Sequence, residues 1–217
     1  MPTLSDGLTK YRNMSYRQDT MMQVDRDKQS AILSAAYDVF INYGFRKTSM
    51  DDIARVAGMS RPALYQLFRN KTDIFRALSM RLLDLMVNDA RNALRSDKPF
   101  GERLFDAIDA SILAQHRKIC TTPHGVELMG VNDEFAGDLE VKWCATMTDT
   151  IAAEIEEAHK HGEISLDGLS VDAEAVAAII MQALEGLKAD AIRGNPVEQK
   201  VERLITFVAN ALVVENR

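Results

Sequence analysis

Three side chains near position 60 have the chemistry needed to read the edges of base pairs. Arg61 can donate two hydrogen bonds to guanine, and Gln66 can pair in the same way with adenine. The methyl group of Ala63 can contact the methyl group of thymine. Such contacts form when the first turns of a helix enter the major groove of DNA. Instead of reading a base, Arg61 could contact a phosphate or remain a solvated charge. Gln66 could equally have no base-reading role.

Enzyme chemistry and metal binding are not indicated. The sequence contains no G-x-S-x-G, no phosphate-binding glycine loop and no H-E-x-x-H motif. His116, Cys120, His124 and Glu127 lie close in sequence, but their spacing fits no zinc-site pattern. We therefore expect no catalytic residues, no metal and no cofactor.

Two short helices would position Arg61. The first is expected over residues 50–57, with Ser49 as its N-cap and Gly58 at its end. The second is expected over residues 61–68, with Ser60 as its N-cap. Two short helices joined by a glycine-containing turn form the helix-turn-helix pattern.

The chain before these helices is expected to contain an arm and one longer helix. Residues 1–26 are polar and lack sustained periodicity, so we interpret them as a flexible arm. Its basic side chains either reach DNA or remain part of a disordered tail. Apolar residues at helical spacing then predict a helix over residues 27–43, which Gly44 ends.

The remainder of the chain is also expected to be helical, because helix formers are plentiful and no strand pattern is visible. The expected helices cover residues 72–95, 102–119, 134–161, 172–193 and 197–214, with a short one after Pro123. The predicted fold is all-α with about nine helices. Its domains are an arm (1–26), a helix-turn-helix head (27–71) and a ligand-binding and dimerisation body (72–217).

Charge is unevenly divided along the 217 residues. Residues 1–95 carry 15 Lys and Arg against 10 Asp and Glu, whereas residues 96–217 carry 11 against 22. A basic first part suits DNA, and an acidic second part avoids it. Only two cysteines, no signal peptide and no membrane-length apolar run are visible, so we expect a cytoplasmic protein.

The segment from Ile32 to Ile74 resembles the tetracycline-repressor (TetR) family of bacterial regulators. The matching residues are Phe40, Tyr43-Gly44-Phe45, Thr48-Ser49, Ile53-Ala54, Ala57-Gly58-Met59-Ser60, Leu64-Tyr65, Phe68 and Lys71. Pro62 stands where the family often has glycine, and the family varies the position of Gln66. Neither departure affects the expected fold, but both leave the operator sequence open.

The resemblance implies roles for further residues of the head. Tyr65, Lys71 and the start of the second helix, at Thr48 and Ser49, are expected to contact DNA phosphates, and Pro62 lies on the DNA-facing helix. Such contacts position a protein on DNA without reading its sequence. Thr48 and Ser49 could instead serve as helix caps only, and Tyr65 could be a surface aromatic residue.

For the body, the resemblance implies a small-molecule pocket and a dimer interface. The apolar candidates for ligand contact, which could equally be plain core, are Phe105, Ile108, Ile112, His116, Met129, Trp143 and Met147. The candidates for the interface lie on the last two helices: Ile180, Leu184, Leu187, Val201, Leu204 and Val208.

The resulting expectation is a homodimeric repressor that binds a palindromic operator and is released by an unknown small-molecule inducer. The alternative is a DNA-binding regulator without a small-molecule effector, controlled by a partner protein or by its own abundance.

Overall fold

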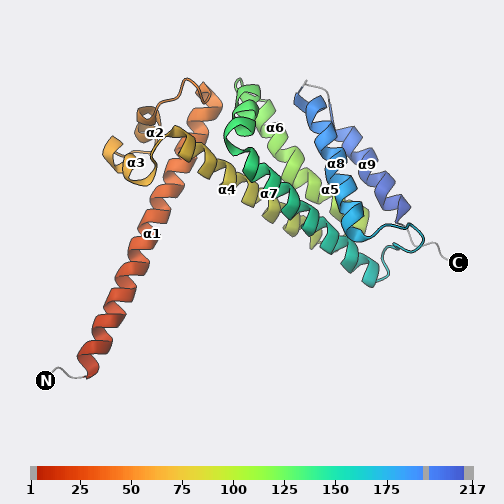
Figure 1. Cartoon of the computed structure of the whole chain (residues 1–217), viewed down its shortest axis with the longest axis horizontal. Coiled ribbons are helices and arrows are strands. Elements are labelled where there is room, and N and C mark those ends of the chain that lie inside the picture. Colours follow the sequence, from red (N-terminus) through yellow and green to blue (C-terminus); the bar gives the residue numbers. More distant parts are fainter. Residues whose placement is uncertain (1–3, 193–195, 213–217) are drawn as a thin grey trace. The chain divides into compact units, whose positions relative to one another are not determined.

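The computed structural model describes the backbone of residues 4–192 and 196–212, and the side chains of residues 24–119, 121–187, 190 and 196–212. Its elements over this part of the chain are all helices, which confirms the all-α fold (Figure 1). They are α1 (Leu4–Tyr43), α2 (Met50–Val56), α3 (Arg61–Leu67), α4 (Lys71–Leu94), α5 (Phe100–Ile108), a π-helix η1 (Asp109–Leu113), α6 (Ala114–Cys120), α7 (Gly125–Lys160), α8 (Ala173–Ile192) and α9 (Glu198–Ala211).

The chain forms two compact units, Met1–Leu78 and Ser79–Arg217. The first unit includes the first two turns of α4, because Ile74, Phe75 and Leu78 are buried there. Farther along the same helix, Val87, Ala90 and Leu94 belong to the core of the second unit. The expected head–body boundary at residues 71/72 lies seven residues earlier than the division between the units.

The first helix begins much earlier than expected. The sequence predicts a start at Asp27, whereas α1 begins at Leu4. Residues 4–26 contain no proline, and adding turns to an existing helix avoids the cost of nucleating a new one. The backbone of this segment is therefore helical, although its side chains up to residue 23 lie outside those described, and the proposed DNA contacts of the arm stay a prediction.

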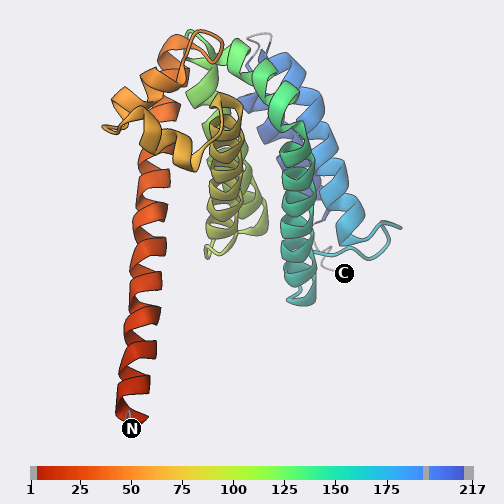
Figure 2. The ribbon, with the colours of Figure 1, turned by 60° about the vertical axis from the view of Figure 1, so that its left-hand side comes forward.

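The helices of the second unit run side by side (Figures 1 and 2). Helix α8 packs along α7, and α9 packs along α5. The buried side chains of these helices include Leu104, Met147, Ile155, Ile180 and Ile205, all at most 2% exposed. One continuous apolar core thus joins segments that are far apart in sequence.

Helix α7 differs from the expectation of a short helix followed by a long one. It is a single helix of 36 residues that runs through Gly130 and Gly137. Each glycine costs a helix about 1 kcal/mol relative to alanine. The burial of Leu128, Val131 and Ala136 on the same turns offsets this cost.

The helix expected over residues 102–119 is interrupted by the π-helix η1. Across this turn, Arg117 Nη1 and Nη2 donate to Asp109 Oδ1 and Oδ2 at 2.8 and 3.1 Å. Two α-helical turns take about seven residues. The wider π turn holds about one residue more, which brings residue 117 onto the same face as residue 109.

Candidate nucleic-acid interface and ligand-binding body

The helix-turn-helix is held by a small apolar core within the first unit. Ile53 of α2 and Leu64 of α3 are fully buried. Behind them, the rings of Phe40, Phe45 and Phe75 pack with centroids 5.2 to 5.7 Å apart. The inner faces of α2 and α3 are thereby fixed, which leaves their outer faces for a ligand.

The ends of the two short helices are set by the residues that the sequence indicates. Ser49 caps α2 and forms a capping box with Asp52, whose backbone N–H donates to Ser49 Oγ at 3.2 Å. Ser60 caps α3 through the N–H of Ala63 at 3.4 Å. Between them, Gly58 adopts φ of +67°, a conformation that glycine takes without strain.

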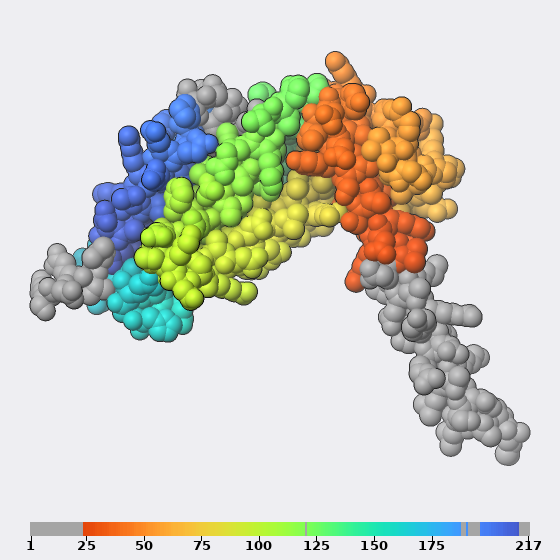
Figure 3. Space-filling model, turned by 180° about the vertical axis from the view of Figure 1, so that it is seen from behind, coloured from red at the N-terminus to blue at the C-terminus, as the bar shows by residue number. Residues whose placement is uncertain are grey.

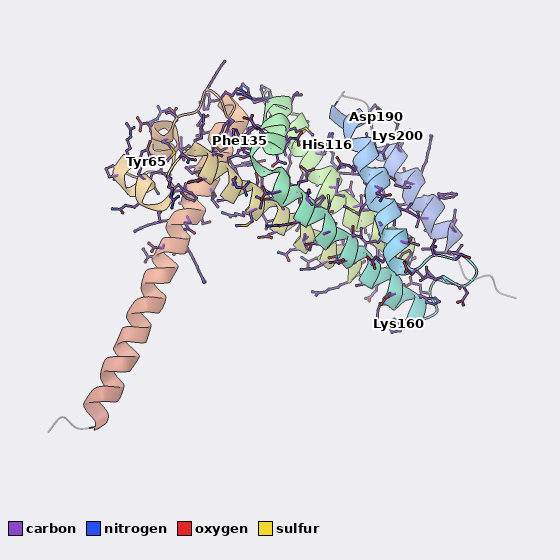
Figure 4. The ribbon with its side chains drawn as sticks, in the orientation of Figure 1. Tyr65, His116, Phe135, Lys160, Asp190 and Lys200 are labelled. Carbon is purple, nitrogen blue, oxygen red and sulfur yellow. The ribbon has the colours of Figure 1, made fainter. Side chains whose placement is uncertain are left out.

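Helix α3 presents the predicted DNA-facing residues to solvent. The side chains of Arg61, Pro62, Tyr65 and Gln66 are exposed, and Ala63 is half-buried. Figure 4 marks the position of Tyr65 on α3. The structure therefore leaves this face open for the base contacts predicted for Arg61, Ala63 and Gln66.

Arg61 is held by neighbours on both helices. Its Nε and Nη1 lie 3.1 and 3.2 Å from the two carboxylate oxygens of Asp51. Its guanidinium carbon lies 5.5 Å from the centre of the Tyr65 ring. A side-chain hydrogen bond with Tyr65 and the charge of Asp51 raise the pKa of Arg61. Sequence reasoning did not identify Asp51 as a partner of Arg61.

Lys71 has a structural role that the sequence did not reveal. Its Nζ donates to the backbone oxygens of Phe45 at 2.6 Å and Thr48 at 2.8 Å, and it lies 4.4 Å from the centre of the Phe45 ring. The ammonium thus ties the start of α4 to the loop before α2. The phosphate contact expected for Lys71 stays a prediction, and these bonds compete with it.

The two other expected phosphate contacts differ from each other. Thr48 is buried, and its hydroxyl donates to the backbone oxygen of Gly44 at 2.6 Å. Ser49 is exposed at the N-terminus of α2, where its hydroxyl donates to Asp52. Thr48 therefore fits the alternative in which it supports the local fold, whereas Ser49 remains accessible to a phosphate.

The candidate pocket residues lie within or against the core of the second unit. Ile108 and Met147 are fully buried, while Phe105, Ile112 and Trp143 are partly buried beside them. His116, on α6 in Figure 4, and Met129 on α7 are half-buried. Ligand contact by these residues stays a prediction.

Two features mark this region as more than uniform core. The indole nitrogen Nε1 of Trp143 is buried and has no hydrogen-bond partner among the described residues. The π-helix η1 begins directly after the buried Ile108, and its Ser111 is fully buried. Buried polar groups without partners are rare, and π turns occur often at functional sites.

The second unit also has an open hollow of about 770 Å³ that does not involve the predicted pocket residues. It lies between the segment from Ser96 to Pro99 and the end of α7. Arg103 at its wall donates to Glu154 Oε1 at 2.7 Å and to Glu163 Oε2 at 2.8 Å. The hydrogen bond from Arg103 lowers the pKa of Glu163 below its ordinary value. The backbone N–H of Phe100, which donates to Glu163 Oε1 at 2.6 Å, lowers it further.

Most of the residues predicted for the dimer interface belong to the core of their own unit. Ile180, Leu184, Val201 and Val208 are buried, and Leu187 and Leu204 are packed against them. A side chain already buried in the protomer offers little further surface to a partner. The interface contacts expected of these six residues stay a prediction, and the exposed side chains of the same helices offer more surface to a partner copy.

The exposed surface of α8 and α9 still contains large apolar residues. Ile179 of α8 is 52% exposed, and Phe207 of α9 is 72% exposed. Helix α9 lies along the surface of the second unit (Figure 3). Asp190 and Lys200 form an ion pair that joins the end of α8 to the start of α9 (Figure 4).

Two kinds of feature do not occur among the described residues. No group of three or more His, Cys, Asp or Glu side chains is placed to hold a metal ion among those residues. None of the helices described there is long and apolar enough to cross a membrane.

Comparison with known proteins supports the reading of the first unit. The family model described as "Bacterial regulatory proteins, tetR family" matches residues 32–78. Over 84 residues the chain is 37% identical to the HTH-type transcriptional activator FasR of Mycolicibacterium smegmatis, covering 39% of this chain and 38% of that protein. This chain therefore spans well under half the length of that relative.

Two further comparisons extend over most of the chain. The HTH-type transcriptional repressor BdcR of Escherichia coli is 24% identical over 168 residues, which cover 77% of this chain and 80% of that protein. The crystal structure of a TetR transcription regulator from Haloarcula marismortui superimposes with a TM-score of 0.67 at 17% identity, covering 87% of this chain and all of that one. The helical body therefore has the fold of these regulators.

Proposed function

We propose that this chain, which belongs to the tetR family of bacterial regulatory proteins, is a DNA-binding transcriptional regulator. The observation that carries the proposal is the outer face of α3, where Arg61, Tyr65 and Gln66 are exposed on a helix fixed from behind by Leu64. A short helix supported in this way can enter the major groove with its N-terminal end toward the bases.

The proposed contacts divide into two kinds. Arg61, Ala63 and Gln66 read bases, while Ser49, Tyr65 and the N-terminus of α2 contact phosphates. Arg61→Ala is expected to cost about 1–3 kcal/mol of binding free energy and to relax the preference at one base pair. Selection of bound fragments from a random duplex library tests this, and an unchanged base preference would remove Arg61 from the base-reading set.

The regulator is proposed to act as a homodimer on a palindromic operator. A two-fold dimer places two copies of α3 about one helical turn apart on DNA, which a monomer cannot do. Ile179 and Phe207 are the exposed apolar side chains of α8 and α9 that a partner copy would bury. Phe207→Glu should give a monomer in analytical ultracentrifugation. The control Val141→Glu, on the exposed surface of α7, should leave the dimer intact. A monomeric wild type at micromolar concentration would contradict the proposed dimer.

The regulator is further proposed to be a repressor that a small molecule releases from DNA. Helix α4 contributes Phe75 to the core of the first unit and Ala90 to the core of the second. A ligand that displaces the part of α4 in the second unit would therefore reorient the DNA-binding unit. By linkage such a ligand binds the DNA-free form more tightly, typically by 1–3 kcal/mol.

The Trp143 region is the proposed effector site. Its unpaired indole N–H suits a ligand that combines an apolar body with a hydrogen-bond acceptor. Trp143 is the only tryptophan of the chain, so its fluorescence reports on ligands directly. A thermal-shift screen followed by titration against a fluorescent operator tests the proposal, and unchanged or tighter DNA binding at saturating ligand would overturn it.

The direction of control needs this experiment because the relatives differ. FasR is named an activator and BdcR a repressor. If no small molecule raises the melting temperature, the alternative of a regulator controlled by a partner protein or by its abundance is favoured.

A further inference from the structure

An acidic side chain stands beside the exposed arginine of α3. Asp51 lies in the first turn of α2, and both of its carboxylate oxygens are within 3.2 Å of Arg61 nitrogens. The two side chains are 59% and 62% exposed. Ion pairs this exposed contribute little to stability, so support of the fold does not explain the pair.

Together, Asp51 and Tyr65 fix the position of the guanidinium. Asp51 contacts one edge, and the Tyr65 ring lies 5.5 Å from the guanidinium carbon. Asp51 belongs to α2 whereas Tyr65 belongs to α3, so the position of Arg61 depends on both helices of the motif. An arginine side chain that is already ordered loses less rotamer freedom when it binds a base.

The contacts with Asp51 leave enough donors for a base. A guanidinium group has five N–H donors, and Asp51 Oδ2 accepts from one on Nη1 while Asp51 Oδ1 lies 3.1 Å from Nε. The remaining donors include both on Nη2, and a guanine edge requires two, for O6 and N7. Arg61 can therefore keep its carboxylate partner while it reads a guanine.

The charge of Asp51 opposes DNA binding in general. A carboxylate at a surface that approaches a polyanion is repelled by phosphates and lowers the affinity for every sequence. It also limits the ability of Arg61 to turn toward a phosphate, because an arginine that leaves Asp51 abandons two contacts. The first effect is the same for every sequence, whereas the second acts against non-specific binding more than against binding at the operator.

We propose that Asp51 is a positioning residue that aims Arg61 at a guanine and so determines base specificity, at some cost in general affinity. The inference rests on the proposed DNA-binding function. It assigns to α2 a share in sequence reading, which the contacts of α3 alone would not indicate. Asp51 acts through Arg61 and need not touch a base itself.

The test compares full-length variants on a random double-stranded DNA library. Asp51→Asn should lower the discrimination at the base pair read by Arg61 by about tenfold, the order of magnitude of one bidentate contact. It should leave non-specific affinity unchanged or raise it. Asp38→Asn removes the same charge from α1, outside this cluster, and should leave the base preference unchanged. Circular dichroism and melting curves confirm that each variant is folded.

A double-mutant cycle separates this inference from the proposed function. In an Arg61→Ala background, Asp51→Asn should have no further effect on base preference, because its effect passes through Arg61. If Arg61→Ala changes the preference but Asp51→Asn does not, the role of Asp51 is wrong while the proposed function stands. If Asp51→Asn sharpens the preference, the carboxylate withholds Arg61 from DNA and the inference is overturned. If the wild type selects no sequence from the library, both the proposed function and the role of Asp51 are wrong.

Discussion

The two units of this chain use different physical means to hold their candidate functional residues. In Met1–Leu78, polar side chains are fixed by short-range polar contacts, as Asp51 fixes the exposed Arg61 and the carbonyl of Phe45 fixes the half-buried Lys71. In Ser79–Arg217, the candidates are apolar residues such as Ile108 and Met147 inside a helix bundle. A local sequence pattern can therefore define the first kind of site, whereas the second emerges only from packing.

Charge follows the same division. The first unit has 12 Lys and Arg against 8 Asp and Glu, whereas the second has 14 against 24. A basic unit attracts phosphates and an acidic unit repels them, which agrees with the proposed DNA contacts of the first unit. The predictions below test whether the two units depend on polar contacts and on apolar packing in the way that the comparison implies.

The largest effect is expected for a charge placed in the core of the second unit. Leu184→Glu buries a carboxylate without a partner, because Leu184 is 7% exposed, and should destabilise the protein by more than about 3 kcal/mol. Gln182→Glu, on the exposed side of the same helix, should change little. Denaturant unfolding followed by circular dichroism measures both. Equal stabilities would show that Leu184 is not buried in solution.

A smaller but still large effect is expected at Lys71 in the first unit. Lys71→Met removes the donor that pairs with the backbone oxygens of Phe45 and Thr48, and should cost about 1–3 kcal/mol. Arg69→Met removes a charge from an exposed neighbour and serves as the control. If Lys71→Met leaves the melting temperature unchanged and only reduces the salt dependence of DNA binding, its role is the phosphate contact alone.

Replacement of two glycines by alanine should change the stability of the protein in opposite directions. Gly58→Ala forces a side chain into φ of +67° and should destabilise the turn of the first unit by about 1–2 kcal/mol. Gly130→Ala meets no atom within 4 Å in α7 and should stabilise the second unit by about 0.5–1 kcal/mol. Melting curves of the two variants should shift in opposite directions. A shift of the same sign would mean that one of the two backbone conformations is wrong.

The smallest effect is a dependence on pH in the second unit. Because the pKa of Glu163 is lowered from its ordinary value of 4.5, its bonds stabilise the folded form above that value. The contribution should be constant between pH 7 and 5 and should decline as the pH falls below about 4.5. Melting temperatures from pH 7 to 3 should show this decline in the wild type and less of it in Glu163→Gln. Identical melting temperatures of the wild type and Glu163→Gln at every pH would show that Glu163 does not contribute to the loss of stability in acid.

The head could be predicted from the sequence because its signals are local. Ser49, Gly58 and Ser60 define helix ends through contacts within a few residues, and the structure has those ends where the pattern indicates. Asp51 and Arg61 are ten residues apart on two helices, so their contact depended on the crossing of those helices and had no local signal. The three-dimensional role of Lys71 was hidden for the same reason, since its partners lie more than twenty residues earlier.

The body could be predicted only as a set of helices. The apolar stripes of α8 and α9 indicated burial correctly, but a stripe does not tell whether it faces its own core or a partner copy. Leu184 and Val201 face their own core, and the exposed Phe207 went unnoticed because it stands outside the stripe. The start of α1 at Leu4 was missed because residues 1–26 are polar and show no sustained periodicity, and the continuity of α7 was missed although a helix after Pro123 was expected.

The π turn at η1 has a consequence for how this chain aligns with its relatives. A helix that gains one residue by insertion can absorb it as a π turn and leave the flanking turns in place. The pair formed by Asp109 and Arg117 shows that absorption, since it joins residues eight apart. Before η1 and after it, the helix therefore follows two different registers of the apolar repeat. An alignment without a gap across residues 109–113 would assign the side chains of α6 to the wrong face, so relatives that lack the π turn should be aligned with a one-residue gap there.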